Sequence, residues 1–161
     1  MIRDVKLEDS KAICDIYNYY IENTIITFEL EKIDSKEMEN RIKEISNKYC
    51  WIVFEEENEI LGYAYIGLWK SREAYNRVSE VTVYLKKGYD RKGIGTKLLK
   101  ELMNRAKKME NMHSLISVIA IPNEGSIKLH EKLGFTKAAY YKEVGYKFDN
   151  YIDVECLQYI L

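Results

Sequence analysis

Two glycines placed one residue apart, Gly93 and Gly95, stand between a strand-like run and the most regular amphipathic helix pattern of the chain. Glycine lets the backbone approach a ligand closely, and the first N–H groups of a helix have no partner inside the helix. Residues 86–100 also carry six Lys or Arg side chains and one Asp. Because the helix dipole and the local charge both favour an anion, this segment predicts a loop that binds a polyphosphate.

Other phosphate-binding motifs fit the segment less well. The Rossmann fingerprint needs a third glycine at the place of Leu98, and the P-loop pattern G-x-x-x-x-G-K-[ST] is absent. A glycine-rich turn beside a solvated helix face stays open as the plain structural alternative.

The apolar pattern predicts a chain that alternates between strands and helices. Period-two and continuous apolar runs predict strands over residues 2–5, 50–55, 60–68, 78–85, 114–121, 135–144 and 151–161. Helical spacing predicts helices over 12–21, 35–47, 94–106 and 126–133, with Asp9 or Ser10 as the first cap and a capping box of Asp34 with Glu37 at the second. This order predicts an α/β (α+β) fold in one domain, 1–161, with a mixed sheet and helices on both faces.

Composition argues against several other classes of protein. The net charge of −1 offers no general attraction to nucleic acid, and no apolar run approaches the roughly 20 residues that cross a bilayer. Met1–Asp4 does not resemble a signal peptide, and three scattered cysteines indicate reduced thiols, so we expect a cytoplasmic protein. His113 and His130 lack ligand spacing, so no metal site is expected.

Two motifs together identify a family. The run Tyr89–Gly95 resembles the acetyl-CoA pyrophosphate loop of the GNAT acetyltransferase superfamily, whose pattern is [QR]-x-x-G-x-[GA]. Asp90 stands at the Gln/Arg position, with Arg91 next to it, which affects one side-chain contact but not the backbone cradle. Downstream, Pro122-Asn123 and then Leu129–Phe135 resemble the second signature of the family. Residues 69–75 and 79–84, with His130, are similar to the subgroup that contains phosphinothricin and methionine sulfoximine N-acetyltransferases.

The resemblance implies the GNAT fold, with a sheet of about seven strands whose central strands splay apart, acetyl-CoA as acyl donor, a small-molecule amine acceptor and a homodimer. The implied acetyl-CoA site consists of Val81, Thr82, Val83, Arg91, Lys92, Gly93, Ile94, Gly95, Thr96, Asn123 and Ser126. The implied acceptor site consists of Phe28, Lys70, Arg72, Tyr75 and Thr82. Here Lys70 and Arg72 would bind an anionic group of the acceptor.

Glu80 and His130 are the candidate catalytic residues. Strand alternation puts Glu80 on one face with Thr82, flanked by valines, where a carboxylate needs a partner or a function. In the subgroup the matching Glu is the general base, and the matching His could protonate the leaving thiolate. The structural alternatives are an ion pair of Glu80 with Arg72 or Arg77, and a histidine held in the core.

Three other functions stay open at this point. A peptide or protein N-terminal acetyltransferase would use the same fold, but a peptide acceptor has no carboxylate near its amine for Lys70 and Arg72. A non-catalytic acetyl-CoA-binding module would not need Glu80 and His130. A nucleic-acid binder would use the basic segment 86–100, which lacks any accompanying base-reading motif.

Overall fold

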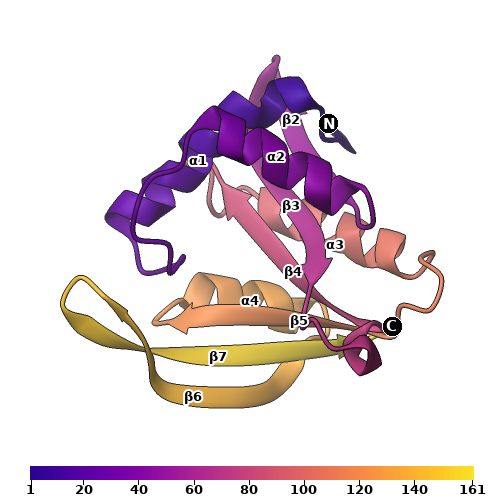
Figure 1. Ribbon diagram of the computed structural model, residues 1–161, viewed down its shortest axis with the longest axis vertical. Coiled ribbons are helices and arrows are strands. Elements are labelled where there is room, and N and C mark those ends of the chain that lie inside the picture. Colours follow the sequence, from indigo (N-terminus) through magenta and orange to yellow (C-terminus); the bar gives the residue numbers. More distant parts are fainter.

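The predicted strands form one mixed sheet in the computed structural model, which describes all of residues 1–161 (Figure 1). The seven strands are β1 Ile2–Asp4, β2 Trp51–Glu56, β3 Glu59–Leu68, β4 Val78–Leu85, β5 Ser114–Ile121, β6 Thr136–Lys147 and β7 Asn150–Ile160. Their order in the sheet is β1-β2-β3-β4-β5-β7-β6, and β4–β5 is the parallel pair. The predicted α/β class and mixed sheet are confirmed.

Four α-helices cover the two faces of the sheet. They are α1 Ser10–Asn23, α2 Ser35–Ser46, α3 Ile94–Ala106 and α4 Glu124–Lys132. The apolar stripe of α1 and the buried side of α2 pack with Trp51 and Tyr63 on one face. Leu98, Leu99 and Leu102 of α3 pack on the other face, which α4 also joins. No helix has both the length and the apolar character needed to cross a bilayer.

The predicted helix caps are only partly right. Asp34 caps α2 by accepting from the Glu37 N–H (2.7 Å), but the Glu37 carboxylate pairs with Arg41 instead of closing the box. Asp9 precedes α1 without capping it, because its carboxylate accepts from the Lys6 N–H (2.7 Å) and closes the 3-10 turn before the helix. Ser10, the other candidate, is the first residue of α1.

The C-terminal elements differ from the prediction at their ends. Helix α4 begins at Glu124, because the Asn123 side chain caps it by accepting from the Ser126 N–H (3.2 Å). Strand β6 begins after Phe135, which is a buried core residue, and runs to Lys147 through a register shift between Tyr141 and Gly145. These bounds depend on pairing with β7, which the local pattern does not encode.

The feature that forms the site is the separation of β4 from β5. The two strands pair only where Val78–Glu80 meets Ser114–Ile116, and beyond that point they diverge, as the middle of Figure 1 shows. Strands β4 and β5 therefore open a V-shaped cleft in the middle of the sheet, and the expectation of splayed central strands is confirmed.

Candidate active site

The cleft between β4 and β5 contains a pocket of about 270 Å³. Its walls come from β4, β5, α4 and the loop after α1, and they bring together Glu80, Asn123, Ser126 and His130. These residues are far apart in sequence, and the divergence of the two strands is what brings them to one cavity. Side chains of several aromatic residues complete the wall: Tyr17, Phe28, Tyr65 and Tyr84.

Glu80 has no partner within the protein. No ion pair or hydrogen bond holds its carboxylate, so the alternative of pairing with Arg72 or Arg77 is not realised. Burial raises the pKa of Glu80 to about 7. A carboxyl group of this pKa exists as base and acid in comparable amounts near neutral pH, which suits a group that accepts and returns a proton. Raised carboxyl pKa values in a cleft are typical of functional sites.

His130 is buried and holds one defined tautomer. Its Nδ1 lies 2.8 Å from the Ser126 carbonyl oxygen, which can only accept, so Nδ1 carries the proton. Its Nε2 is buried without a partner, and burial lowers the pKa of His130. The imidazole is therefore neutral and offers Nε2 as an acceptor. The expected role as proton donor to a thiolate needs a proton that Nε2 does not carry in this arrangement.

Backbone amides of β4 also face the cleft. In an antiparallel ladder, alternate residues turn their peptide groups to the same partner strand. The Lys86 N–H donates to the Leu61 carbonyl (2.9 Å), which places the even-numbered residues of β4 in bonds with β3. Val81 and Val83 consequently turn their N–H groups toward β5, which has already diverged. These amides fit an extended ligand that lies along β4, with Val81 N–H closest to Glu80.

The glycine loop forms a second cavity, of about 500 Å³, at the start of α3. Gly93 caps the helix with a positive φ of 78°, and Arg91 before it also has a positive φ, of 59°. This left-handed geometry folds the loop around the first N–H groups of α3, as an anion-binding loop requires. Arg91, Lys128 and Lys132 supply positive charge at the wall.

Most of the predicted acetyl-CoA residues line these cavities. They are Val81, Thr82, Val83, Arg91, Gly93, Gly95, Thr96, Asn123 and Ser126. Two predicted residues do not: Ile94 is buried in the core beneath α3, and the Lys92 ammonium lies over the Tyr89 ring at 4.1 Å. The two cavities adjoin and form one channel from the loop to Glu80, because they share six lining residues: Ile26, Val83, Tyr84, Asn123, Ser126 and His130. A long molecule with an anionic end fits this channel.

The acceptor residues predicted from sequence are only partly brought together. Phe28 and Thr82 line the Glu80 pocket, whereas Lys70, Arg72 and Tyr75 do not. The Lys70 ammonium lies over the rings of Trp69 and Tyr75, at 5.4 and 5.1 Å, and Arg72 is exposed before the short 3-10 turn Glu73–Tyr75. These three residues stand on the connection between β3 and β4, outside the lining of the pocket, and their role as acceptor residues stays a prediction. Sequence reasoning missed Tyr17, Thr27, Tyr65 and Ser117, whose only signal is an ordinary core pattern.

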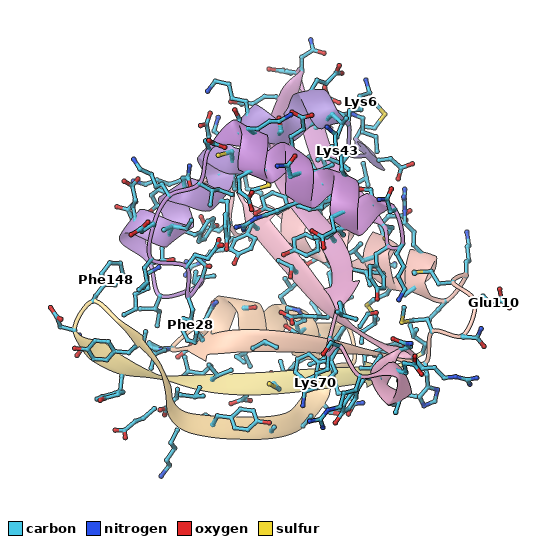
Figure 2. All side chains as sticks on the ribbon, in the orientation of Figure 1. Lys6, Phe28, Lys43, Lys70, Glu110 and Phe148 are labelled. Atoms are coloured by element: carbon cyan, nitrogen blue, oxygen red, sulfur yellow. The ribbon has the colours of Figure 1, made fainter.

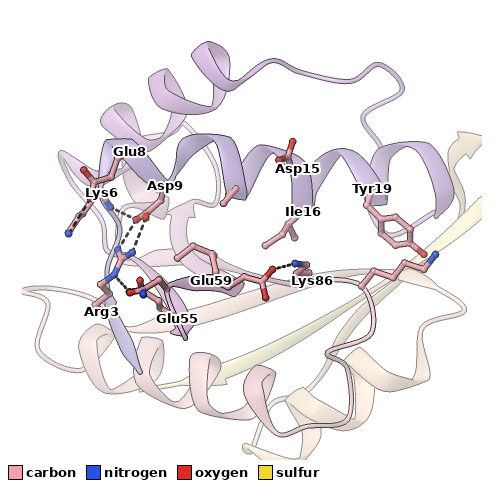
Figure 3. A pocket seen from close by; sticks show the side chains of 14 residues that line it. Arg3, Lys6, Glu8, Asp9, Asp15, Ile16, Tyr19, Glu55, Glu59 and Lys86 are labelled. Atoms are coloured by element: carbon pink, nitrogen blue, oxygen red, sulfur yellow. Dashed lines mark hydrogen bonds and ion pairs between the residues drawn. The ribbon is translucent and has the colours of Figure 1, made fainter.

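A larger polar depression, of about 630 Å³, lies between α1 and the β2–β3 hairpin (Figure 3). Three of its four cations are already paired: Arg3 with Asp9 and Glu55, Lys6 with Glu8, and Lys86 with Glu59. The fourth, Lys87, places its ammonium over the Tyr19 ring at 5.0 Å. The depression shares no lining residue with the channel. The depression is therefore a solvated charged surface, and the chemistry belongs to the cleft.

Comparison with known proteins agrees with this geometry. Residues 2–155 match the acetyltransferase (GNAT) domain family. The chain is 35% identical to the phosphinothricin N-acetyltransferase of Streptomyces viridochromogenes over 95% of this chain and 83% of that protein. It is 32% identical to the L-methionine sulfoximine/L-methionine sulfone acetyltransferase of Salmonella typhimurium, over 98% of this chain and 92% of that one. A GNAT superfamily phosphinothricin acetyltransferase from Sinorhizobium meliloti, solved in complex with AcCoA, matches with a TM-score of 0.96 and 31% identity, over 100% of this chain and 88% of that chain. These matches confirm acetyl-CoA as the acyl donor and confirm the family resemblance of the two motifs. The chain belongs to the GNAT acetyltransferase family.

Proposed function

We propose that this protein transfers the acetyl group of acetyl-CoA to the amino group of a small amino acid or amino-acid analogue, of the phosphinothricin or methionine sulfoximine type. One observation carries the proposal. The unpartnered Glu80 carboxylate faces a channel whose other end is the phosphate-binding loop at Gly93. The names of the relatives support the acceptor class.

The residues of the cleft suit this reaction. Glu80 accepts the proton that the amine loses as its nitrogen bonds to the acetyl carbon, directly or through one water. The Val81 N–H donates to the acetyl oxygen as that oxygen gains negative charge. His130 lines both cavities, and its neutral ring helps to shape the wall against which the reactants are held. CoA leaves as the thiolate when the carbon–sulfur bond breaks, and the proton that Glu80 took from the amine returns to the sulfur, directly or through water.

A thiol-release assay tests the acceptor class directly. Wild-type protein is supplied with acetyl-CoA and a panel of phosphinothricin, methionine sulfoximine, proteinogenic amino acids, polyamines and short peptides. We expect kcat/KM to be highest for an amino-acid analogue. Peptides as the best acceptors would favour an N-terminal acetyltransferase, and acetyl-CoA binding without any turnover would favour a non-catalytic module.

Lys70 and Arg72 remain our proposed source of positive charge for the acceptor's anionic group, acting from outside the pocket. The Lys70 ammonium lies over the Trp69 ring at 5.4 Å, and Trp69 packs against a cluster that contains Val154, a residue of the pocket wall. We expect Lys70→Ala and Arg72→Ala each to raise the acceptor KM by roughly 10- to 100-fold, the effect of losing one charged hydrogen bond. The KM for acetyl-CoA should stay unchanged, and Lys108→Ala, an exposed change beyond α3, serves as the control. Acceptor KM values equal to the control would remove both residues from the site.

We also propose that residues 1–161 form one catalytic unit that works as a homodimer in the cytoplasm, where the three free cysteines would stay reduced. Support for the dimer comes from the β6–β7 hairpin, where Val144, Tyr146 and Tyr151 are 60, 56 and 69% exposed. A cluster of exposed apolar side chains of this kind is typical of an interface. Light scattering at micromolar concentration should give twice the chain mass, and Tyr151→Glu should give the monomer. Leu7→Glu, at an exposed apolar position in the 3-10 turn before α1, should leave the dimer intact, and a monomeric wild type would contradict the proposal.

A further inference from the structure

The loop between α1 and α2, residues 24–34, forms one wall of the Glu80 pocket although it contains no helix or strand. Ile26, Thr27 and Phe28 all line the pocket. Thr27 and Phe28 do not line the cavity at the start of α3, so they belong to the acceptor end of the channel. Because this loop has no regular secondary structure, contacts with other elements must hold it in place. We call these contacts its anchors.

The far end of the loop is held at Ile33, whose C=O and N–H bond to the Asn18 side chain of α1 (2.8 and 3.1 Å). Two further anchors hold the segment from Thr27 to Glu29 against the helices that flank the loop. The Tyr17 hydroxyl of α1 bonds to the Thr27 hydroxyl (2.8 Å). Arg41 of α2 donates from Nη1 and Nη2 to the two oxygens of the Glu29 carboxylate (3.0 and 2.7 Å). These contacts hold the base of the loop against its own helices, but they leave the Phe28 ring unsupported.

A fourth anchor comes from Lys147, at the end of β6. Its side chain is 3% exposed, and its ammonium donates to the Thr27 carbonyl (2.9 Å) across 120 positions of sequence. No carboxylate lies within ion-pair distance of it, and burial lowers the pKa of Lys147. A buried ammonium costs free energy unless it makes good hydrogen bonds. The bond to Thr27 therefore ties the C-terminal hairpin to the loop.

The fifth anchor is the contact of the Phe28 ring with Gly145, which has no side chain to keep the ring away. A Cβ at this position would lie 2.4 Å from Cζ of Phe28, so the ring rests directly on the bare backbone of β6. Gly145 follows the register shift after Tyr141: β6 advances four residues, from Tyr141 to Gly145, while the antiparallel partner moves back only two, from Val154 to Ile152. That irregularity brings Gly145 beneath the ring. Figure 2 shows Phe28 between the loop and the strands of the C-terminal half.

We propose that Gly145 and Lys147 are positioning residues that hold Thr27 and Phe28 over the Glu80 pocket and thereby set the affinity for the acceptor, without touching it. The inference rests on the proposed function, because it assigns this end of the channel to the acceptor. Neither residue lines either cavity. Their variants should therefore change the acceptor KM and leave the KM for acetyl-CoA as it is.

Gly145→Ala tests the contact with the ring. The added methyl displaces Phe28, and we expect the acceptor KM to rise roughly 10- to 100-fold, the order of effect of misplacing a positioning group. Phe28→Leu and the double variant that combines Gly145→Ala with Phe28→Leu complete a double-mutant cycle. If displacement of the ring is the cause, Gly145→Ala has no further effect once Phe28 is replaced. Additive effects, or an acceptor KM unchanged in Gly145→Ala, would overturn the role of Gly145.

Lys147→Met tests the hydrogen bond while keeping the length of the side chain, and Lys142→Met is the matched control on the exposed part of β6. We expect Lys147→Met to raise the acceptor KM and to speed tryptic cleavage after Lys32, inside the loop, while the control changes neither. Equal cleavage and equal KM in the two variants would overturn the role of Lys147. Cleavage rates also separate this inference from the proposed function. If wild-type protein acetylates no amine in the panel, the proposed function fails. Faster cleavage in Lys147→Met, and not in the control, would still show that Lys147 holds the loop in place.

Discussion

Glu80→Gln lowers kcat by about 10²- to 10⁴-fold, the usual contribution of one general base, while the Kd for acetyl-CoA stays at the wild-type value. The amide has the size of the carboxyl group but cannot take a proton from the amine. No charged or hydrogen-bonded partner of Glu80 is lost with it, because the structure contains none. Steady-state kinetics and a calorimetric titration with acetyl-CoA measure the two effects separately.

The pH dependence of the wild-type enzyme provides a second measurement on Glu80. Because burial raises the pKa of this carboxyl to about 7, the basic form is lost as the pH falls through that value. We expect kcat/KM to decrease on the acid side with an apparent pKa near 7 and this limb to disappear in Glu80→Gln. Burial destabilises the charged form of Glu80, which is the main form at pH 8. The Tm of Glu80→Gln at pH 8 should therefore be no lower than the Tm of the wild type. A glutamine variant with a near-normal rate would exclude Glu80 as the base.

His130→Phe should lower kcat less than Glu80→Gln does, because Nε2 of His130 is an acceptor without a proton to give.

Gly95→Val raises the KM for acetyl-CoA by about 100-fold or more. Gly95 is buried in the first turn of α3 and lines the phosphate end of the channel. A Cβ there would lie 3.3 Å from Cδ2 of Leu129 and 3.7 Å from Cδ1 of Leu85. A branched side chain therefore pushes α4 away from α3 and changes both sides of the cavity. Loss of one or two charged hydrogen bonds to phosphate, about 1.5–3 kcal/mol each, accounts for the magnitude.

A size series controls for damage to the fold. Gly95→Ala should raise the same KM only slightly, because the flexible end of Leu129 can move by a few tenths of an ångström. The Tm of each variant is measured with its kinetics, and the acceptor KM should stay constant across the series. An acetyl-CoA affinity that does not change with the size of the side chain would place the phosphate site elsewhere.

The sequence by itself predicted the elements and the family. The helix at 94–106 and the strand at 78–85 carry strong local periodicity, and local periodicity survives folding because each element buries one face. Glu80 and the glycine loop were also found in this way, since a carboxylate between valines and a Gly-x-Gly before a helix are local signals.

Tertiary structure alone decided what surrounds those residues. That Glu80 is unpaired and that Lys70 and Arg72 do not line its pocket depend on where β4 and β5 separate. That Nε2 of His130 is buried without a partner depends on how the ring packs against Phe135. The contact of Gly145 with Phe28 joins segments more than one hundred residues apart and depends on an irregular register in β6. Such contacts are set by packing between distant elements, and the pattern of residues within either element does not predict them.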